Sequence, residues 1–294
     1  MPTLLHLRDS IVPKIAFSSL AGNLTAYVAI SDYMQSVLSD YLSVPGHKIF
    51  RINNGVHMPS PPSAEERRKA RKNLGYEPDE IAFLSASAFV PWKNQRSFLD
   101  AYKTVKNKIP NSRIVICGDD ISGENSNVAS RINSGVRGLG DLAEAPGYVE
   151  DLTPYFHAAD VFVHPAIGEP FGRVVVEAQA AGLPVVCYRS GSMEQVVAEG
   201  ETGLIAELEA KKLGEKLLQI AKDEELRARL ASNAPRHAAQ FSVEKCVQGI
   251  YDLYGKMVSG DLPQPEKKQK KPTPQKELLR QRQLRDRKRK ETTQ

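Results

Sequence analysis

The chain alternates between short apolar runs and longer segments in which apolar and charged residues mix at helical spacing. Such alternation is typical of α/β folds, in which buried parallel strands are joined by crossover helices. We expect strands at residues 3–7, 27–31, 81–87, 113–117 and 159–165, and another directly after Pro184. We expect helices at residues 32–42, 64–74, 95–108, 172–181, 211–231 and 242–258, and a loosely bounded one within 121–139. The predicted fold class is a doubly wound parallel α/β sheet.

Helix-start signals sharpen two of these boundaries. Thr153 followed by Pro154 is expected to act as an N-cap with proline at the first helical position. Ser242 is expected to cap the helix that closes the fold, because a serine hydroxyl can accept a bond from a first-turn amide.

Two carboxylates flank a third helix start. Glu169 and Glu177 lie on either side of Phe171 and Gly172, directly after a buried strand. A helix start offers unpaired N–H groups and a positive dipole end, which suit a phosphate, and Gly172 allows close approach. Glu177, about 7 Å along the helix axis at 1.5 Å per residue, can accept bonds from ribose hydroxyls. The spacing is consistent with a nucleotide-sugar site, and equally with two solvated surface glutamates.

The Glu169–Glu177 pair resembles the E-x7-E signature of retaining glycosyltransferases of the GT-B fold, particularly family 4. Other stretches that resemble motifs of that family follow one another in order between residues 53 and 204. They are Asn53-Asn54-Gly55-Val56, Phe89-Val90-Pro91-Trp92-Lys93-Asn94, Ile114-Val115-Ile116-Cys117-Gly118-Asp119, Pro146-Gly147-Tyr148-Val149, Ala158-Ala159-Asp160-Val161, and Ser190-Gly191-Ser192-Met193-Glu194-Gln195-Val196-Val197 with Gly200 and Thr202-Gly203-Leu204. Together they resemble the family closely enough that the resemblance implies a Rossmann-like domain that binds nucleotide sugars.

The resemblance implies roles for individual residues. Lys93 corresponds to the family lysine that contacts the donor diphosphate, and Lys93 and Glu169 are the expected catalytic residues. Glu177 corresponds to the glutamate that binds ribose, and Glu169 to the one that touches the donor sugar. Val149 corresponds to the position whose backbone pairs with the base. The other expected donor-binding residues are Phe171, Gly172, Arg173 and Val174. From the residues alone, Lys93 is also compatible with a solvated loop lysine and Val149 with a core valine.

One departure from the family pattern lies inside the donor site. The family arginine that partners the lysine would lie five residues before Lys93, where this chain has Ala88. Ser85 and Ser87 lie nearby, but a hydroxyl is a weaker substitute for a guanidinium fork. The departure puts catalytic power in doubt more than the fold.

A second departure concerns domain organisation. We expect a remnant of the family's first domain at residues 1–57, the nucleotide-sugar domain at 58–259 and a basic tail at 260–294. His6 is expected to be a packed core residue. Residues 1–54 are expected to pack imperfectly or to pair with a partner chain, and the closing helix to be poorly covered. Three explanations stay open: a fragment of a longer reading frame, half of a split enzyme, or a remnant that binds nucleotide sugars without transfer.

The composition is typical of a globular protein. The chain has 294 residues, of which 41% are apolar, as in globular proteins. No apolar run reaches the roughly 18 residues of a membrane span, and the start lacks the pattern of a secretory signal. Cys117, Cys187 and Cys246 have no metal-site spacing and are expected to be buried thiols in a reducing compartment. The predicted localisation is cytoplasmic, with a peripheral membrane association as an option.

The positive charge is concentrated in the tail. Residues 261–294 hold twelve Lys and Arg against five Asp and Glu, a net of +7, so the rest carries +5 − 7 = −2. Such a segment is expected to be disordered or to form a basic helix, and it favours an anionic membrane surface over nucleic acid because it lacks aromatic residues. A solvated solubility tail is the alternative. A tail-driven adaptor is therefore a third class of function to test.

The sequence predicts a retaining glycosyltransferase with a UDP- or GDP-sugar donor and a glycan, lipid-linked or small-molecule acceptor. No metal and no other cofactor are expected, because nothing resembles an Asp-x-Asp site near the donor loop. The alternative is a non-catalytic or split-enzyme subunit that binds nucleotide sugars and needs a partner chain for the rest of the cleft.

Overall fold

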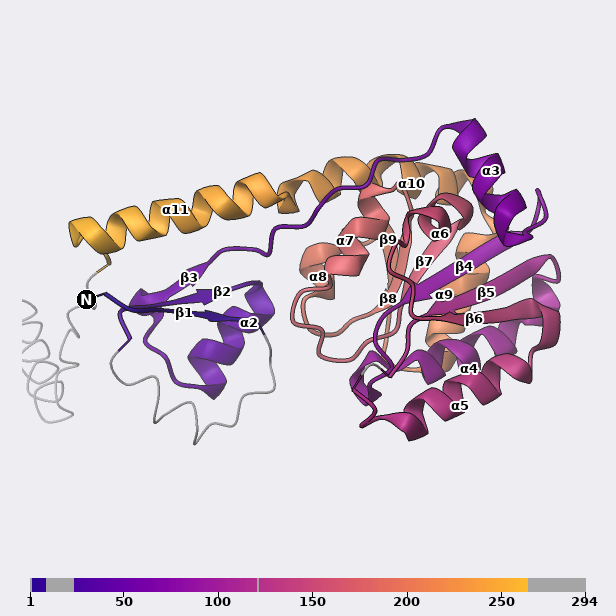
Figure 1. Cartoon of the computed structure of the whole chain (residues 1–294), viewed down its shortest axis with the longest axis horizontal. Coiled ribbons are helices and arrows are strands. Elements are labelled where there is room, and N and C mark those ends of the chain that lie inside the picture. Colours follow the sequence, from indigo (N-terminus) through magenta and orange to yellow (C-terminus); the bar gives the residue numbers. More distant parts are fainter. Residues whose placement is uncertain (1, 9–23, 121, 264–294) are drawn as a thin grey trace, which may run out of the picture.

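The computed structural model of the chain describes residues 2–8, 24–120 and 122–263. It contains a larger and a smaller parallel sheet, which lie at opposite ends of an elongated molecule (Figure 1). The expectations for the basic tail fall, from residue 264 onward, outside the described residues.

The larger sheet has six strands in the order β6-β5-β4-β7-β8-β9, all of them parallel. Its strands are β4 (Ile81–Ala86), β5 (Ser112–Cys117), β6 (Ala143–Gly147), β7 (Val161–His164), β8 (Val185–Tyr188) and β9 (Gly203–Ala206). The strand order reverses between β4 and β7, because the chain leaves β4 toward β5 and later returns to its other side. This reversal is the switch point of a doubly wound fold, where ligands bind beyond the carboxyl ends of the strands. The predicted fold class is confirmed.

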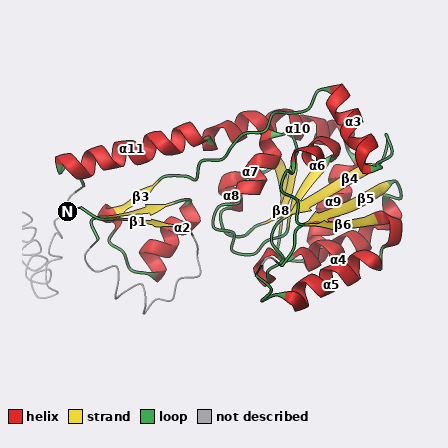
Figure 2. Ribbon diagram, in the orientation of Figure 1, coloured by secondary structure: helices red, strands yellow, loops and turns green. Residues whose placement is uncertain are grey.

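Helices cover both faces of this sheet (Figure 2). Successive side chains of a strand point to opposite faces, so Phe83 packs in one apolar cluster and Leu84 in the other. The Phe83 face is covered by α4 (Gln95–Val105), α5 (Ser126–Arg137) and α9 (Ala210–Lys222). The Leu84 face is covered by α3 (Ala64–Leu74), α6 (Thr153–Ala158), α7 (Arg173–Ala180) and α8 (Met193–Val196), and α10 (Glu224–Ala238) lies against α7.

The smaller sheet consists of β1 (Leu4–Leu7), β2 (Ala26–Ala29) and β3 (Ile49–Arg51), paired in parallel in that order. Helix α2 (Asp32–Ser36) and a π-helical turn at Val37–Tyr41 follow β2. The closing helix α11 (Val243–Ser259) runs from the larger unit back to this sheet (Figure 1). There Leu253 and Met257 pack against Ala26 and Val28, small side chains that allow the helix to approach closely.

Only part of the apolar surface of α11 is covered. Val247, Tyr251, Tyr254 and Val258 recur at helical spacing and are exposed. The expectation of a poorly covered closing helix thus holds for this stripe and fails for the one formed by Leu253 and Met257. None of the described helices combines the length and the apolar character that a bilayer crossing requires.

Two predicted helix boundaries are wrong. The single helix expected at residues 211–231 is two helices, α9 and α10, because Asp223 interrupts it and its side chain accepts a bond from the amide of Leu226. Thr153 is the first residue of α6 and not its N-cap, and its amide donates to Asp151. The other predicted boundaries lie close to those observed, and Ser242 caps α11 as predicted.

The prediction of three buried thiols is partly wrong. Cys117, which ends β5, and Cys187, which lies within β8, are buried, and burial raises the pKa of Cys117 to about 12. Cys246 is only partly buried, because it lies on α11 where this helix leaves the larger unit.

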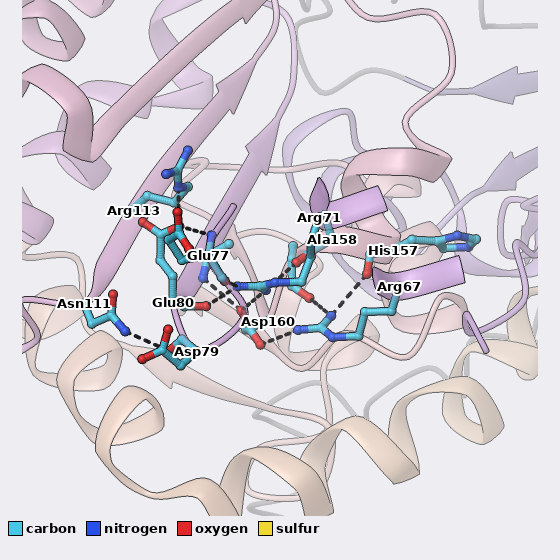
Figure 3. A network of polar contacts seen from close by, with 12 residues as sticks. Arg67, Arg71, Glu77, Asp79, Glu80, Asn111, Arg113, His157, Ala158 and Asp160 are labelled. Carbon is cyan, nitrogen blue, oxygen red and sulfur yellow. Dashed lines mark hydrogen bonds and ion pairs between the residues drawn. The ribbon is translucent and has the colours of Figure 1, made fainter. Parts of the chain in front are cut away.

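A buried polar network ties α3 to the sheet (Figure 3). Arg71 donates to the carbonyls of Ala158, Glu77 and Glu80 and pairs with Asp160. The carboxylate of Asp160 also accepts a bond from the amide of Ala82 in β4. The terminal guanidinium nitrogens of Arg71 and the carboxylate of Asp160 are thus paired, whereas the buried Nε of Arg71 has no hydrogen-bond partner. The pairing offsets most of the cost of burying the two charges.

Candidate functional site

A cavity of about 430 Å³ opens beyond the carboxyl ends of β4, β5, β6 and β7. Every donor-binding residue predicted from the sequence lines it. They are Lys93, Val149, Glu169, Phe171, Gly172, Arg173, Val174 and Glu177. Arg8, Ile30 and Asn54, which follow the strands of the smaller sheet, also line this cavity, so both sheets border the site.

The start of α7 faces this cavity. Gly172 is the N-cap residue and has a φ of 89°, a left-handed conformation that favours glycine. A Cβ at this position would also lie 2.7 Å from Cε of Met193. The first amides of a helix have no partner within it, so those of Arg173 and Val174 are available to an anion.

Glu169 collects two donors on one oxygen. Its Oε2 lies 2.6 Å from Nζ of Lys93 and 2.9 Å from Nε2 of His164. All three side chains are largely withdrawn from solvent, with 14% of Lys93, 7% of Glu169 and 1% of His164 exposed. The Lys93 ammonium also lies 4.1 Å from the centroid of the Trp92 ring, a cation–π contact that holds it over the cavity wall.

Burial and charge oppose each other in this cluster. Burial raises the pKa of Glu169, but the hydrogen bond from His164 and the positive charge of Lys93 outweigh it, so the pKa of this carboxyl lies below its usual range. Burial lowers the pKa of His164 more than the nearby carboxylate raises it. At neutral pH the cluster therefore contains an ionised Glu169 and a neutral imidazole.

Glu177 lies farther along α7 and is half-buried. Burial raises its pKa, and the charges of Arg173 and His57 counteract part of that rise. A carboxylate that has lost part of its hydration gains more from a ligand hydroxyl than a fully solvated one does. Its place on the cavity wall suits the ribose contact that the sequence predicts.

A second loop fixes the segment that carries Glu169. The amide of Ser192 donates to the carbonyl of Glu169 at 2.9 Å, and the Ser192 hydroxyl donates to the carbonyl of Phe171 at 2.8 Å. Ser190 Oγ accepts a bond from the amide of Gly168. A Cβ on Gly191 would lie only 2.3 Å from the carbonyl oxygen of Glu169, so the two loops are in backbone contact.

A family model described as "Glycosyl transferases group 1" matches residues 66–237, more than half of the chain. The chain belongs to the glycosyl transferases group 1 family. The match contains the whole wall formed by Lys93, Val149 and residues 169–177.

Relatives of this glycosyl transferases group 1 chain are longer than it is. An uncharacterized glycosyltransferase of Methanocaldococcus jannaschii, MJ1178, is 27% identical over 85% of this chain and 65% of its own length. A D-inositol 3-phosphate glycosyltransferase of Rhodococcus erythropolis is 32% identical over 65% of this chain and 45% of its own length. The chain thus spans less than two thirds of the curated relatives it matches here.

Solved structures share the fold. The Anabaena protein Alr3699/HepE, crystallised with UDP and glucose, is 25% identical, with a TM-score of 0.78 over 86% of this chain and 71% of its own. A sucrose-phosphate synthase of Thermosynechococcus elongatus has a TM-score of 0.77 over 87% of this chain and 68% of its own, at 23% identity. At that level of identity the second likeness concerns the fold alone.

The structure shows what surrounds the position of the missing family arginine. Ala88 lines the cavity, and so does Ser87, whose Oγ accepts a bond from Nε2 of Gln95 at 2.7 Å. Ser85 is only 1% exposed and does not line the cavity, so its hydroxyl offers nothing to a ligand there. Within the described parts of the chain, no cluster of His, Cys, Asp and Glu is arranged to hold a metal ion.

Sequence reasoning missed His164, Trp92 and the contribution of the smaller sheet. His164 ends an apolar run and therefore resembles a core residue, although a histidine placed directly before a ligand loop is itself a signal. Trp92 stands next to Lys93 within the recognised motif. Asn54 lies within a recognised motif, but neither it nor Arg8 was predicted to line the donor site, because only the folded chain brings the smaller sheet to the cavity.

Proposed function

We propose that this protein is a glycosyltransferase that takes a sugar from a nucleoside diphosphate sugar and transfers it with retention of configuration. The observation that carries the proposal is that Lys93, Glu177 and the start of α7 line one cavity at the switch point of the larger sheet. The crystal structures of HepE with UDP and with UDP-glucose support a UDP-sugar as the donor, and a GDP-sugar is the alternative.

Different residues of the cavity suit different parts of such a donor. The amides at the start of α7 and the Lys93 ammonium suit the diphosphate, since both present positive charge to the cavity. Glu177 suits the ribose hydroxyls and the backbone of Val149 the base. Glu169 suits hydroxyls of the sugar, because its carboxylate is ionised and partly dehydrated.

In the transfer step, the bond between the anomeric carbon and the β-phosphate oxygen breaks, and its electron pair stays with the diphosphate. The acceptor oxygen bonds to the anomeric carbon on the same face, and its proton passes to the departing phosphate oxygen. Lys93 and the α7 amides stabilise the charge that develops on the diphosphate, a preorganised electrostatic role. We propose that this positive charge from the chain suffices without a metal or another cofactor.

Calorimetric titration with UDP and GDP tests the donor site. We expect one nucleotide to bind the unaltered protein, and Glu177→Ala to weaken that binding roughly 10- to 100-fold, as for loss of a hydrogen bond to a charged group. Glu225→Ala, which removes an exposed glutamate on α10, is the matched control and should leave the affinity unchanged.

The outcome separates binding from transfer. If neither nucleotide binds, or if Glu177→Ala binds as well as the control variant, the donor-site assignment is wrong. If the nucleotide binds but release of UDP or GDP from the corresponding sugar nucleotide never exceeds the rate without protein, with or without candidate acceptors, the chain is a binding subunit and the transferase assignment fails.

A further inference from the structure

Oε2 of Glu169 has two donors of different character. Lys93 comes from the short 3₁₀ turn Pro91–Lys93 and ends in a flexible ammonium. His164 is the last residue of β7 and is fully buried in the sheet. We propose that His164 is a positioning residue, which holds Glu169 in place for the donor sugar while Lys93 serves the diphosphate. This inference rests on the proposed function, because it presumes that Glu169 meets the sugar.

The contact fixes the tautomer of His164. A carboxylate oxygen only accepts hydrogen bonds, so at 2.9 Å the hydrogen must be on Nε2 of the imidazole. Burial lowers the pKa of His164 and keeps the ring neutral, so it provides one N–H and no charge. The imidazole thus acts on Glu169 as a directional donor and does not compete with Lys93 for the anionic ligand.

The backbone holds His164 firmly. All four residues of β7 are buried, and the strand pairs with β4 on one side and β8 on the other. The His164 ring stacks on Phe162, with centroids 6.4 Å apart and planes 17° from parallel. A histidine has two side-chain torsions and a lysine four, so the imidazole loses less entropy than the ammonium in keeping one position.

The Lys93 ammonium cannot bond fully to Glu169 and to the donor diphosphate at the same time. It lies 2.6 Å from Glu169 in the described structure and lines the cavity that would hold the diphosphate. When Nζ turns toward phosphate oxygens, a buried Glu169 without another donor would be left unpaired, which is costly. His164 removes that cost because it stays bonded to Oε2. Among the described residues, no hydrogen bond reaches Oε1 of Glu169, which leaves that oxygen for a sugar hydroxyl.

The test compares the affinity for a sugar nucleotide with that for the bare nucleotide, UDP-glucose against UDP. His164→Leu removes the donor, and His164→Gln keeps an amide N–H near the place of Nε2. We expect His164→Leu to weaken UDP-glucose binding about tenfold more than UDP binding, and His164→Gln to restore most of the ratio. If the nucleotide titrations select guanine, GDP-mannose and GDP replace this pair.

Val163→Ala is the structural control. It removes buried volume from the same strand but on the opposite face, so it should lower stability and leave the ratio of the two affinities unchanged. If His164→Leu does not fold, His164→Asn takes its place, because the shorter amide keeps polarity and loses the reach to Oε2.

The results discriminate between the two levels of the proposal. If the unaltered protein binds neither nucleotide, the proposed function fails. If it binds and Glu177→Ala weakens binding, but the ratio in His164→Leu or His164→Asn equals that of the unaltered protein, the positioning role is refuted. The role is also refuted if His164→Gln lowers the ratio as much as His164→Leu does.

Discussion

The hydroxyl of Ser31 donates a hydrogen bond of 2.6 Å to the carbonyl oxygen of Pro170, 139 residues away in the chain. Ser31 is also the N-cap of α2, since its Oγ accepts a bond from the amide of Met34. One buried side chain therefore joins the smaller sheet to the loop that presents Glu169 and Gly172. Asp32 adds a second link, because its amide donates to the side chain of Gln195.

Ser31→Ala should reduce stability by about 1–2 kcal/mol, because it removes a helix cap and leaves a buried carbonyl without its donor. Urea unfolding followed by circular dichroism measures the change. Ser36→Ala is the matched control, an exposed serine of the same helix, and should cost much less. Equal effects of the two substitutions would contradict the role given to the Ser31–Pro170 bond.

Gly191→Ala should disturb the site through backbone contact. Gly191 and Gly200 both have positive φ, at 61° and 74°, so alanine is strained at either by about 1–2 kcal/mol. Only at Gly191 would the new Cβ meet the backbone of Glu169, whereas at Gly200 nothing lies within 4 Å. We expect Gly191→Ala to lose more stability and to bind the sugar nucleotide more weakly. Identical melting temperatures and affinities for the two variants would refute the contact.

Arg71→Met should be severely destabilising. It leaves Asp160 with one buried cationic partner fewer and several carbonyls without their donor (Figure 3). Breaking a buried ion pair from one side typically costs about 3–5 kcal/mol. Arg68→Met changes an exposed arginine of the same helix and should be nearly neutral in a thermal melt. A loss below about 1 kcal/mol for Arg71→Met would show that the network contributes little.

Donor affinity should depend on pH through Glu177. Burial raises the pKa of Glu177 above its ordinary 4.5, whereas the pKa of Glu169 is low. Hydroxyls bind to the charged carboxylate, so affinity is constant above the raised pKa and falls as the pH drops through it. Titration with UDP-glucose across this range should show the fall, and Glu177→Gln should abolish it. An unchanged pH dependence in Glu177→Gln would assign the fall to another group.

Local signals in the sequence predicted much of the fold. The apolar runs gave the central strands, and Ser63 with Glu66 forms a capping box that starts α3 where the charge pattern placed it. The break at Asp223 was missed although Asp followed by two glutamates is a helix-start signal. There the continuous leucine spacing of the two helices masked the boundary.

The candidate site was predictable as far as its motifs are contiguous. Lys93, Glu169 and Glu177, which line the cavity, could be selected because each lies within a short pattern. His164 and Ser31 were not, because their partners are set by how the β7 loop turns back and by how the two sheets meet. Such contacts depend on tertiary packing, which a one-dimensional pattern does not encode.

The chain passes between the two sheets twice at one place. The amide of Val56 donates to the carbonyl of Phe241 at 2.9 Å, and Val56 forms a parallel bridge with Ser242. A Cβ on Gly55 would lie 2.8 Å from Cα of Val243, so the two passes touch. The two sheets are therefore connected by two backbone segments, at residues 55–56 and 241–243, that lie in contact with each other. A rotation of one sheet relative to the other must bend both connecting segments together. Because both sheets border the cavity, such a rotation also changes the width of the cavity.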